Sequence, residues 1–167
     1  MTDSHTSSRR ESQPIQDGPE PYRLTEVQHA LDQSIAADET LSSICYQLRC
    51  SAFACDWDGW EEAHRECMLS NHYRLTASGC LKRMAMGDWH ETLLMTLVQC
   101  LYLARRADRI KQGYFHRLCG SASEGFRPTA ELLLVWNRHA EAHLQEAMVG
   151  AQHLLGTRQW TRWMPET

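Results

Sequence analysis

The chain has 167 residues, of which 43% are hydrophobic, and a formal net charge of −4. That length suits one domain with a hydrophobic core of its own. A negative net charge without clusters of Lys and Arg argues against nucleic acid and anionic membranes as partners. The longest apolar segments are interrupted before ~18 residues, so no membrane span is expected.

The first 21 residues are almost entirely polar, and Ile15 is their one large aliphatic side chain. Burial of so little apolar surface cannot offset the entropy of ordering, so residues 1–21 are predicted to be a disordered tail. The rest divides into a single helical domain over residues 22–157 and a C-terminal tail over residues 158–167.

The first two predicted helices form a hairpin. Apolar side chains recur at helical spacing from Leu24 to Ile35 and again from Leu41 to Ala54. Thr25 has the form of a capping-box residue. The intervening residues 37–39 are predicted to be the connection.

The next two predicted helices are shorter. Asp58, followed by Glu61, has the pattern of a helix N-terminus and predicts a helix that ends near His72. A fourth helix is expected from Thr76 to Met86.

Gly87 stands where a helix C-terminus favours a left-handed residue, and Asp88 is predicted to cap a fifth helix that reaches Ile110. A segment rich in Gly and Ser follows, and it predicts a break with at most one helical turn. Pro128 then marks the start of a long final helix that ends at Gly156. Because the alternation typical of strands is absent, the sequence predicts an all-α fold.

The seven cysteines occupy apolar helical positions and form no Cys-x-x-Cys pair or zinc spacing. Their odd number and scatter are typical of free thiols that behave as small hydrophobic side chains. Free thiols persist in reducing compartments, so a cytoplasmic location is predicted.

Two similar segments carry the clearest motif: Asp58-Gly-Trp60 followed by Glu-Glu-Ala, and Gly87-Asp-Trp89 followed by His-Glu-Thr. Each places a Trp at a corner between helices, which resembles the turn of a tetratricopeptide repeat. The stretch from Glu61 through Trp89 also resembles the small tetratricopeptide-like chaperones of type III secretion. That resemblance implies a groove that holds a segment of another protein. The expected packing is therefore either a tetratricopeptide-like array of helical hairpins or an irregular bundle, with a long C-terminal helix.

Candidate metal ligands occur only in pairs. His139 and His143 share a face of the final helix, and Glu61 with His64 resembles half of a di-iron motif. Because two ligands do not make a site, neither a metal nor a cofactor is expected. The alternative is a metal- or haem-binding helical bundle with redox activity, which the nine His and seven Met would serve, although no haem-attachment motif is present.

Large amphipathic aromatic side chains are frequent anchors at protein interfaces. Three of the six tryptophans fall on apolar stripes and are predicted to lie in the core: Trp60, Trp89 and Trp136. The C-terminal aromatic segment is expected either to pack back or to serve as an anchor. The predicted partner-binding residues are Trp57, Tyr102, Trp160 and Trp163.

No nucleophile elbow, phosphate-binding loop or His-Glu-x-x-His motif is present, so nothing in the sequence points to an enzyme. The predicted function is that of an adaptor or chaperone that holds a protein or peptide segment in a groove. The groove is expected along the hairpins between Leu41 and Arg106, with the final helix as a cover. Helix-in-groove recognition would suit such a site, and a homo-oligomer is a further possible partner.

Overall fold

A computed structural model describes residues 21–50 and 58–165, and within these ranges every regular element is an α-helix, as predicted. The predicted tail over residues 1–21 lies outside the described residues except for Pro21. The helices are α1 (Pro21–Cys50), α2 (Trp60–Ala85), α3 (Glu91–Ser121), α4 (Arg127–Leu155) and α5 (Thr157–Trp163).

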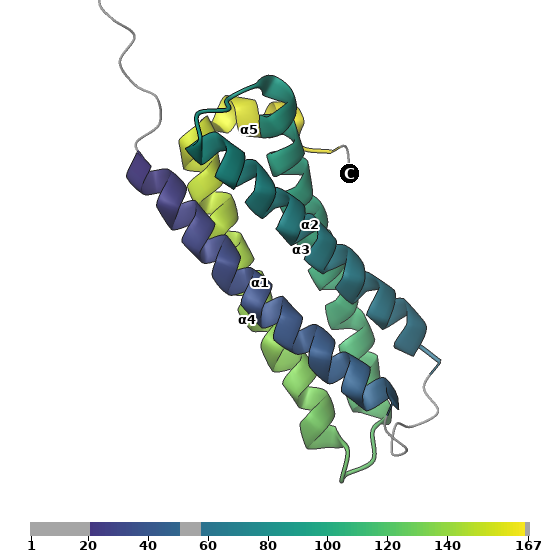
Figure 1. Cartoon of the computed structure of the whole chain (residues 1–167). Helices are drawn as coiled ribbons and strands as arrows, with labels where there is room; N and C mark the ends of the chain where they lie inside the picture. Colours follow the sequence, from purple (N-terminus) through teal and green to yellow (C-terminus); the bar gives the residue numbers. More distant parts are fainter. Residues whose placement is uncertain (1–20, 51–57, 166–167) are drawn as a thin grey trace, which may run out of the picture.

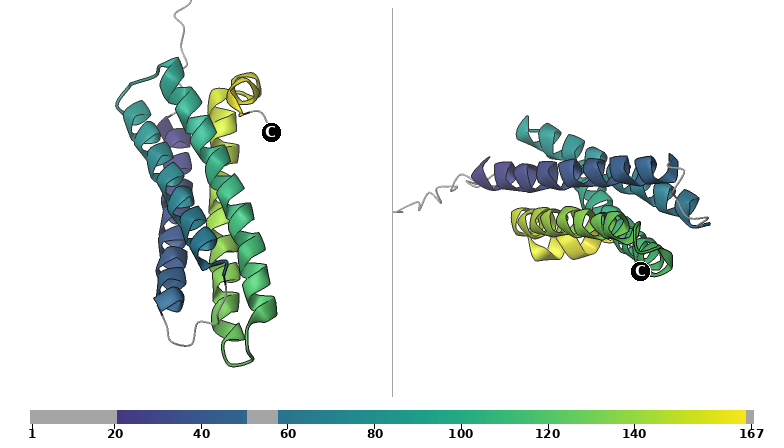
Figure 2. Two further views of the ribbon diagram at one scale, coloured as in Figure 1. Left: turned by 90° about the vertical axis from the view of Figure 1, so that its right-hand side faces the viewer. Right: turned by 90° about the horizontal axis from the view of Figure 1, so that it is seen from below.

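The first four helices run up and down along one axis and form an antiparallel bundle (Figures 1 and 2). Helix α1 packs against α2 and α4, and α3 packs against the same two neighbours. Because the first and fourth helices are in contact, the four helices form a closed bundle. Of the two expected arrangements, the structure therefore shows the helical bundle rather than a tetratricopeptide-like array of hairpins. The short helix α5 turns back across one end and contacts α3 and α4.

Three predicted interruptions are wrong, because the helices continue through them. Helix α1 runs through residues 37–39, α2 runs through residues 73–75, and α3 extends beyond Ile110 to Ser121. Each misread segment holds a charged residue that the fold buries completely: Asp38, Arg74 and Lys111. Charged residues normally indicate solvent exposure, so these positions broke the apolar pattern.

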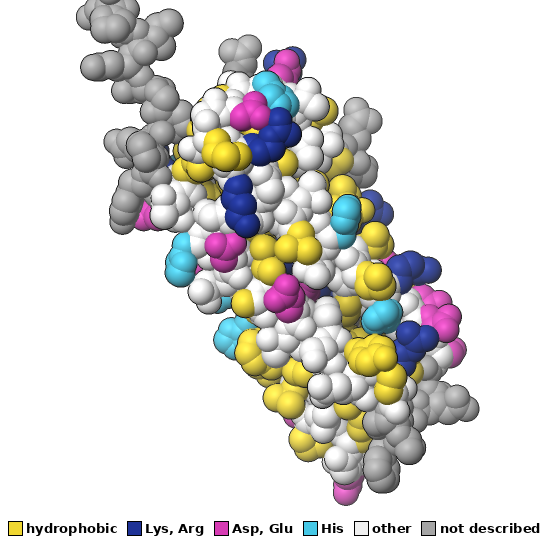
Figure 3. Space-filling view, viewed as in Figure 1, with side chains coloured by type: hydrophobic (Ala, Val, Ile, Leu, Met, Phe, Trp, Pro, Cys, Tyr) yellow, Lys and Arg dark blue, Asp and Glu magenta, His cyan; other side chains and the backbone are white. Residues whose placement is uncertain are grey.

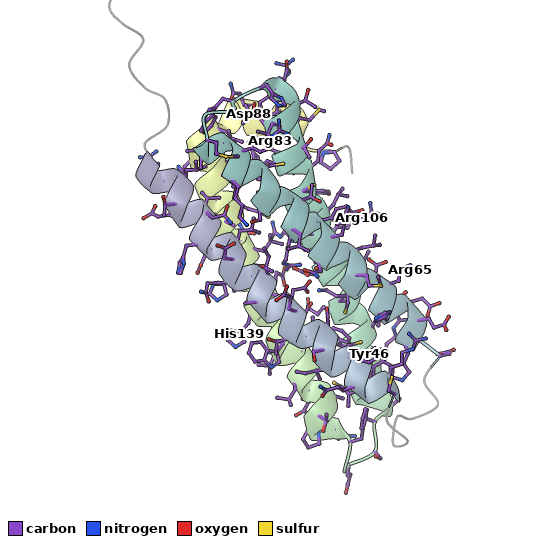
Figure 4. All side chains as sticks on the ribbon, in the orientation of Figure 1. Tyr46, Arg65, Arg83, Asp88, Arg106 and His139 are labelled. Carbon is purple, nitrogen blue, oxygen red and sulfur yellow. The ribbon has the colours of Figure 1, made fainter. Side chains whose placement is uncertain are left out.

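Of three residues predicted to mark helix ends, the structure confirms the role of one and corrects the roles of two. Gly87 has a φ of +89°, as expected of a left-handed residue after a helix. The side chain that caps α3 is His90, whose Nδ1 accepts a hydrogen bond from the Leu93 amide at 3.1 Å. Asp88 instead forms an ion pair with Arg83 at 2.5 Å (Figure 4). Helix α2 begins at Trp60, close to the predicted start, but Gly59 is at the N-cap position and no side chain caps the helix. Asp58 is therefore not the capping residue that its pattern indicated.

The hydrophobic core consists of two clusters, one toward each end of the bundle. One includes Leu31, Leu97 and Leu144, and the other includes Leu41 and Phe115. A layer of buried polar and charged side chains accompanies them. The interior between the helices is therefore filled by the chain's own side chains.

The tryptophans predicted for the core have different environments. Trp60 is buried, as predicted, and Trp136 is partly buried against the second cluster. Trp89 is 38% exposed, so its predicted place in the core was wrong. It precedes α3 by two residues, outside the helical register from which its burial was inferred.

Among the described residues, no helix has the length and apolarity that crossing a membrane requires.

Candidate functional site: a surface groove and a buried charged layer

A charged layer crosses the bundle interior at mid-length, and its four charged side chains have no exposed surface. Helix α1 contributes Asp38, α2 contributes Arg74, and α3 contributes Asp108 and Lys111. Two acids and two bases leave the layer without formal net charge. Burial of isolated charges is expensive, so this pairing is what permits the layer to exist.

Arg74 and Asp108 form the best-defined pair in the layer. The guanidinium Nη2 lies 2.5 Å from Asp108 Oδ2, and Nη1 lies 3.1 Å from Asp108 Oδ1. Arg74 Nε also donates to Ser34 Oγ at 2.8 Å. This two-point contact fixes α2 relative to α3 in both distance and orientation.

Lys111 joins the remaining members of the layer. Its ammonium donates to Asp38 and to Ser70 Oγ, the latter at 3.0 Å, and lies 2.9 Å from Asp108 Oδ1. Asn137 of α4 donates to the Asp108 carbonyl at 3.0 Å, so all four helices take part. Asp38 Oδ2 accepts no hydrogen bond and faces Arg74 Nη1 at 3.6 Å.

The ion pairs keep Asp108, Arg74 and Lys111 charged despite burial. Burial opposes the charge of Asp108, but Lys111 and Arg74 outweigh it and lower the pKa of this carboxyl. Burial likewise opposes the charges of Arg74 and Lys111, while the two aspartates raise the pKa of each. Such a layer has no surface on which a ligand could bind, and it sets the register of the four helices.

One surface feature that could hold a ligand is a groove of about 780 Å³ between the first half of α1 and the second half of α4. Its floor is apolar, and its rims carry acidic and imidazole groups. The floor contains Val27, Ala30, Val149 and Gly150. The rims contain Glu26, His29, Gln33, His143 and Glu146.

The groove exists where two helices approach closely. A Cβ atom placed on Gly150 would lie 2.7 Å from Val27 Cγ2, so only glycine permits this spacing without a shift. Small residues allow helices to come together in this way, and the seam then presents a lengthwise depression on the surface.

Helix α4 also carries exposed apolar side chains outside the groove. Val135 and Leu132, like Val149 within the groove, are each more than two-fifths exposed. His139 lies between Val135 and Val149 in the helix, and its ring centroid is 5.8 Å from that of Trp136. Figure 3 shows histidine and hydrophobic side chains along this edge, and Figure 4 places His139 on the opposite side from Arg65 and Arg106.

Of the residues predicted to bind a partner, the three that the structure describes do not line this groove. Trp160 and Trp163 are buried in the first core cluster, because α5 packs back onto the end of the bundle. Tyr102 is partly buried on α3. Trp57 lies outside the described residues.

The structure brings no third ligand to either candidate metal-binding pair among the described residues. His143 Nδ1 lies 3.2 Å from Glu146 Oε2, which gives the imidazole a protein partner. His64 lines a second, smaller groove together with Glu61 and Arg65. Within the described ranges, no group of three or more His, Cys, Asp or Glu side chains could hold a metal ion.

Sequence reasoning missed both the groove and the charged layer. The signal for the groove was Gly150, a residue with poor helix propensity that interrupts a strongly apolar helix. The signal for the layer was the set of charged residues at helical spacing from apolar ones. Neither signal is visible without knowing which helices are neighbours.

The chain matches no protein-family model, no curated protein and no solved structure with which it was compared.

Proposed function

We propose that this protein is a non-enzymatic adaptor or chaperone that binds a helical segment of another protein in the groove between α1 and α4. The observation that carries the proposal is the apolar floor of that groove with its polar rims, together with the exposed apolar side chains elsewhere on α4. Apolar surface that is rimmed by polar residues marks many protein-binding sites.

The shape of the groove favours a helix as the bound segment. Two parallel rims separated by an apolar floor accept an amphipathic helix, which inserts residues three and four apart along one face. Val149 lines the groove and is exposed on α4, so it can contact such anchors. The rim groups His29, Gln33 and Glu146 can then form hydrogen bonds with the polar flanks of the helix.

The experiment compares partner capture by two variants with matched chemistry. Val149→Glu places a charge on the groove floor, whereas Ile110→Glu places one at an equally apolar exposed position of α3 that does not line the groove. The tagged full chain and both variants are expressed in the native cells and recovered, and bound proteins are quantified. We expect Val149→Glu to lose the partner at least tenfold and Ile110→Glu to retain it. Equal capture by both variants would refute this site.

The alternative redox bundle is tested separately on the purified protein. Elemental analysis and a visible absorption spectrum are expected to show neither stoichiometric metal nor a haem band. A stoichiometric metal or a haem band would favour the alternative over the adaptor.

A further inference from the structure

Carboxylates stand on both rims of the groove between α1 and α4. Glu26 belongs to the α1 rim and Glu146 to the α4 rim, and both residues are exposed. The Glu146 side chain is 65% exposed, although His143 Nδ1 lies 3.2 Å from its Oε2. No Lys or Arg is among the described residues that line the groove. The apolar floor is therefore flanked by acidic groups on both sides.

The close approach of Val27 and Gly150 sets the positions of the two carboxylates along the groove. Helices α1 and α4 run antiparallel (Figure 1), and Glu26 is next to Val27 in α1. Glu146 precedes Gly150 by four residues of α4, which is ~6 Å at 1.5 Å per residue. The two carboxylates therefore stand on opposite rims about one helical turn apart. A helix that lies in the groove passes between them.

The charges of the whole bundle are arranged in the same sense. Helix α1 holds four acidic residues and two arginines, whereas α3 holds five Arg and Lys and two acidic residues. These helices occupy opposite corners of the bundle because, within the described ranges, α1 contacts α2 and α4 but not α3. Figure 4 likewise shows Arg65 and Arg106 on the side away from His139. The field of the protein thus favours a cationic partner on the side of the groove.

We propose that the helical segment bound in this groove is basic and amphipathic, with Lys or Arg on both flanks of its apolar face. This inference rests on the proposed function, because it names the chemistry of the occupant of that same groove. The apolar face of the segment contacts Ala30 and Val149 on the floor, and its cationic flanks approach Glu26 and Glu146.

The carboxylates act as a selectivity device rather than as the main source of affinity. Burial of apolar side chains on the floor is available to any amphipathic helix, whatever the charge of its flanks. Complementary charges on the rims add attraction for basic flanks, and like charges there disfavour acidic flanks. The groove therefore selects basic helices over acidic helices of equal hydrophobicity.

The test measures the binding of three synthetic peptides to the purified full-length chain. All three are about 18 residues long, which is enough for a helix, and share one pattern of Leu at helical spacing. Their remaining positions are Lys in the first, Gln in the second and Glu in the third. Fluorescence anisotropy of labelled peptides gives the dissociation constants. We expect the Lys peptide to bind about tenfold more tightly than the Glu peptide, with the Gln peptide between them, and added salt to narrow the difference.

Two charge-reversal variants locate the selectivity. Arg23 shares a smaller adjoining hollow with Glu26, so Glu146 offers the cleaner substitution. Glu146→Lys should weaken the Lys peptide about fivefold and strengthen the Glu peptide. The matched control is Glu131→Lys, an exposed position of α4 that does not line the groove. It lies ~22 Å from Glu146 along the helix, well beyond the screening length of ~8 Å at physiological salt, so it should bind the peptides as the unmodified chain does.

The Gln peptide separates failure of this inference from failure of the proposed function. If the Gln peptide binds but the Lys and Glu peptides bind equally well, the groove stands and the basic partner is refuted. Equal weakening of the Lys peptide by both variants also refutes it, because the attraction then comes from net charge alone. If none of the three peptides binds, the groove itself fails and the inference falls with it. Circular dichroism checks the fold of each variant, and the comparison of peptides on the unmodified chain is decisive without any variant.

Discussion

Replacement of Arg74 by Met tests the buried charged layer most severely. The substitution keeps an apolar stem of similar length but removes the donors to Ser34 and the two-point contact with Asp108. Asp38 and Asp108 then share Lys111 as their one remaining positive charge in the layer, without access to water. Loss of one partner from a buried ion pair typically costs about 3–5 kcal/mol.

The loss is large compared with the stability of a domain of this size. Small proteins unfold with free energies of about 5–15 kcal/mol, so the Arg74→Met variant should lose a substantial fraction of its stability. Urea denaturation followed by circular dichroism at neutral pH measures the change as a lower midpoint with little change in slope.

A matched control comes from the surface of the same helix. Arg83 pairs with Asp88 at 2.5 Å, but both side chains are more than one-third exposed. Exposed pairs contribute about 0–1 kcal/mol, so Arg83→Met should be nearly neutral. A loss from Arg74→Met no larger than that from Arg83→Met would refute the reasoning. The double variant Arg74→Met with Asp108→Leu restores charge balance, so it should recover part of the loss.

Three further outcomes follow from the structure. The pKa of Asp108 is lowered in the folded state, so the stability that its charge contributes is fully present above the ordinary carboxyl pKa of about 4. This stability is lost as the pH falls through the lower pKa of the folded state. Urea midpoints measured across acidic pH will show the loss. Gly150→Ala should destabilise the bundle by about 1–2 kcal/mol because the added Cβ meets Val27. Gly113→Ala should stabilise it by about 0.5–1 kcal/mol, because this helical position has open space around it. Equal melting temperatures of the two variants would contradict this. Trp160→Ala should cost about 3 kcal/mol in urea denaturation because the indole is buried in the core, and a neutral result would show that α5 does not pack as described.

The fold class was accessible from the sequence because apolar periodicity and turn residues act locally. The final helix was predicted from Pro128 to Gly156, and α4 spans Arg127–Leu155. The left-handed Gly87 was also predicted, since only the local backbone determines that preference.

The errors in helix length have one physical origin. Asp38, Arg74 and Lys111 lie in segments that were interpreted as breaks, yet each is buried among partners on other helices. Their compatibility with the core depends on residues far away in the chain, such as the contact between Lys111 and Asp38. Local patterns carry no record of such pairing, so three helices were predicted too short.

The groove escaped prediction for a similar reason. It is formed by residues of α1 and α4, which are the first and fourth helices of the bundle and are adjacent only after folding. The predicted tryptophan anchors were chosen for residue type and for their positions at a corner or in the C-terminal tail. Trp160 and Trp163 were taken up by the core instead, because α5 folds back over the end of the bundle.

The most direct measurement of the proposed function is site-specific photo-crosslinking in the native cell. A photoreactive amino acid is introduced at Ala30, on the groove floor, and in a second protein at Arg106, on the opposite side of the bundle (Figure 4). We predict that the probe at position 30 crosslinks to a helical segment of another protein and that the probe at position 106 does not. Equal labelling at both positions, or crosslinks at position 106 alone, would contradict a binding groove between α1 and α4.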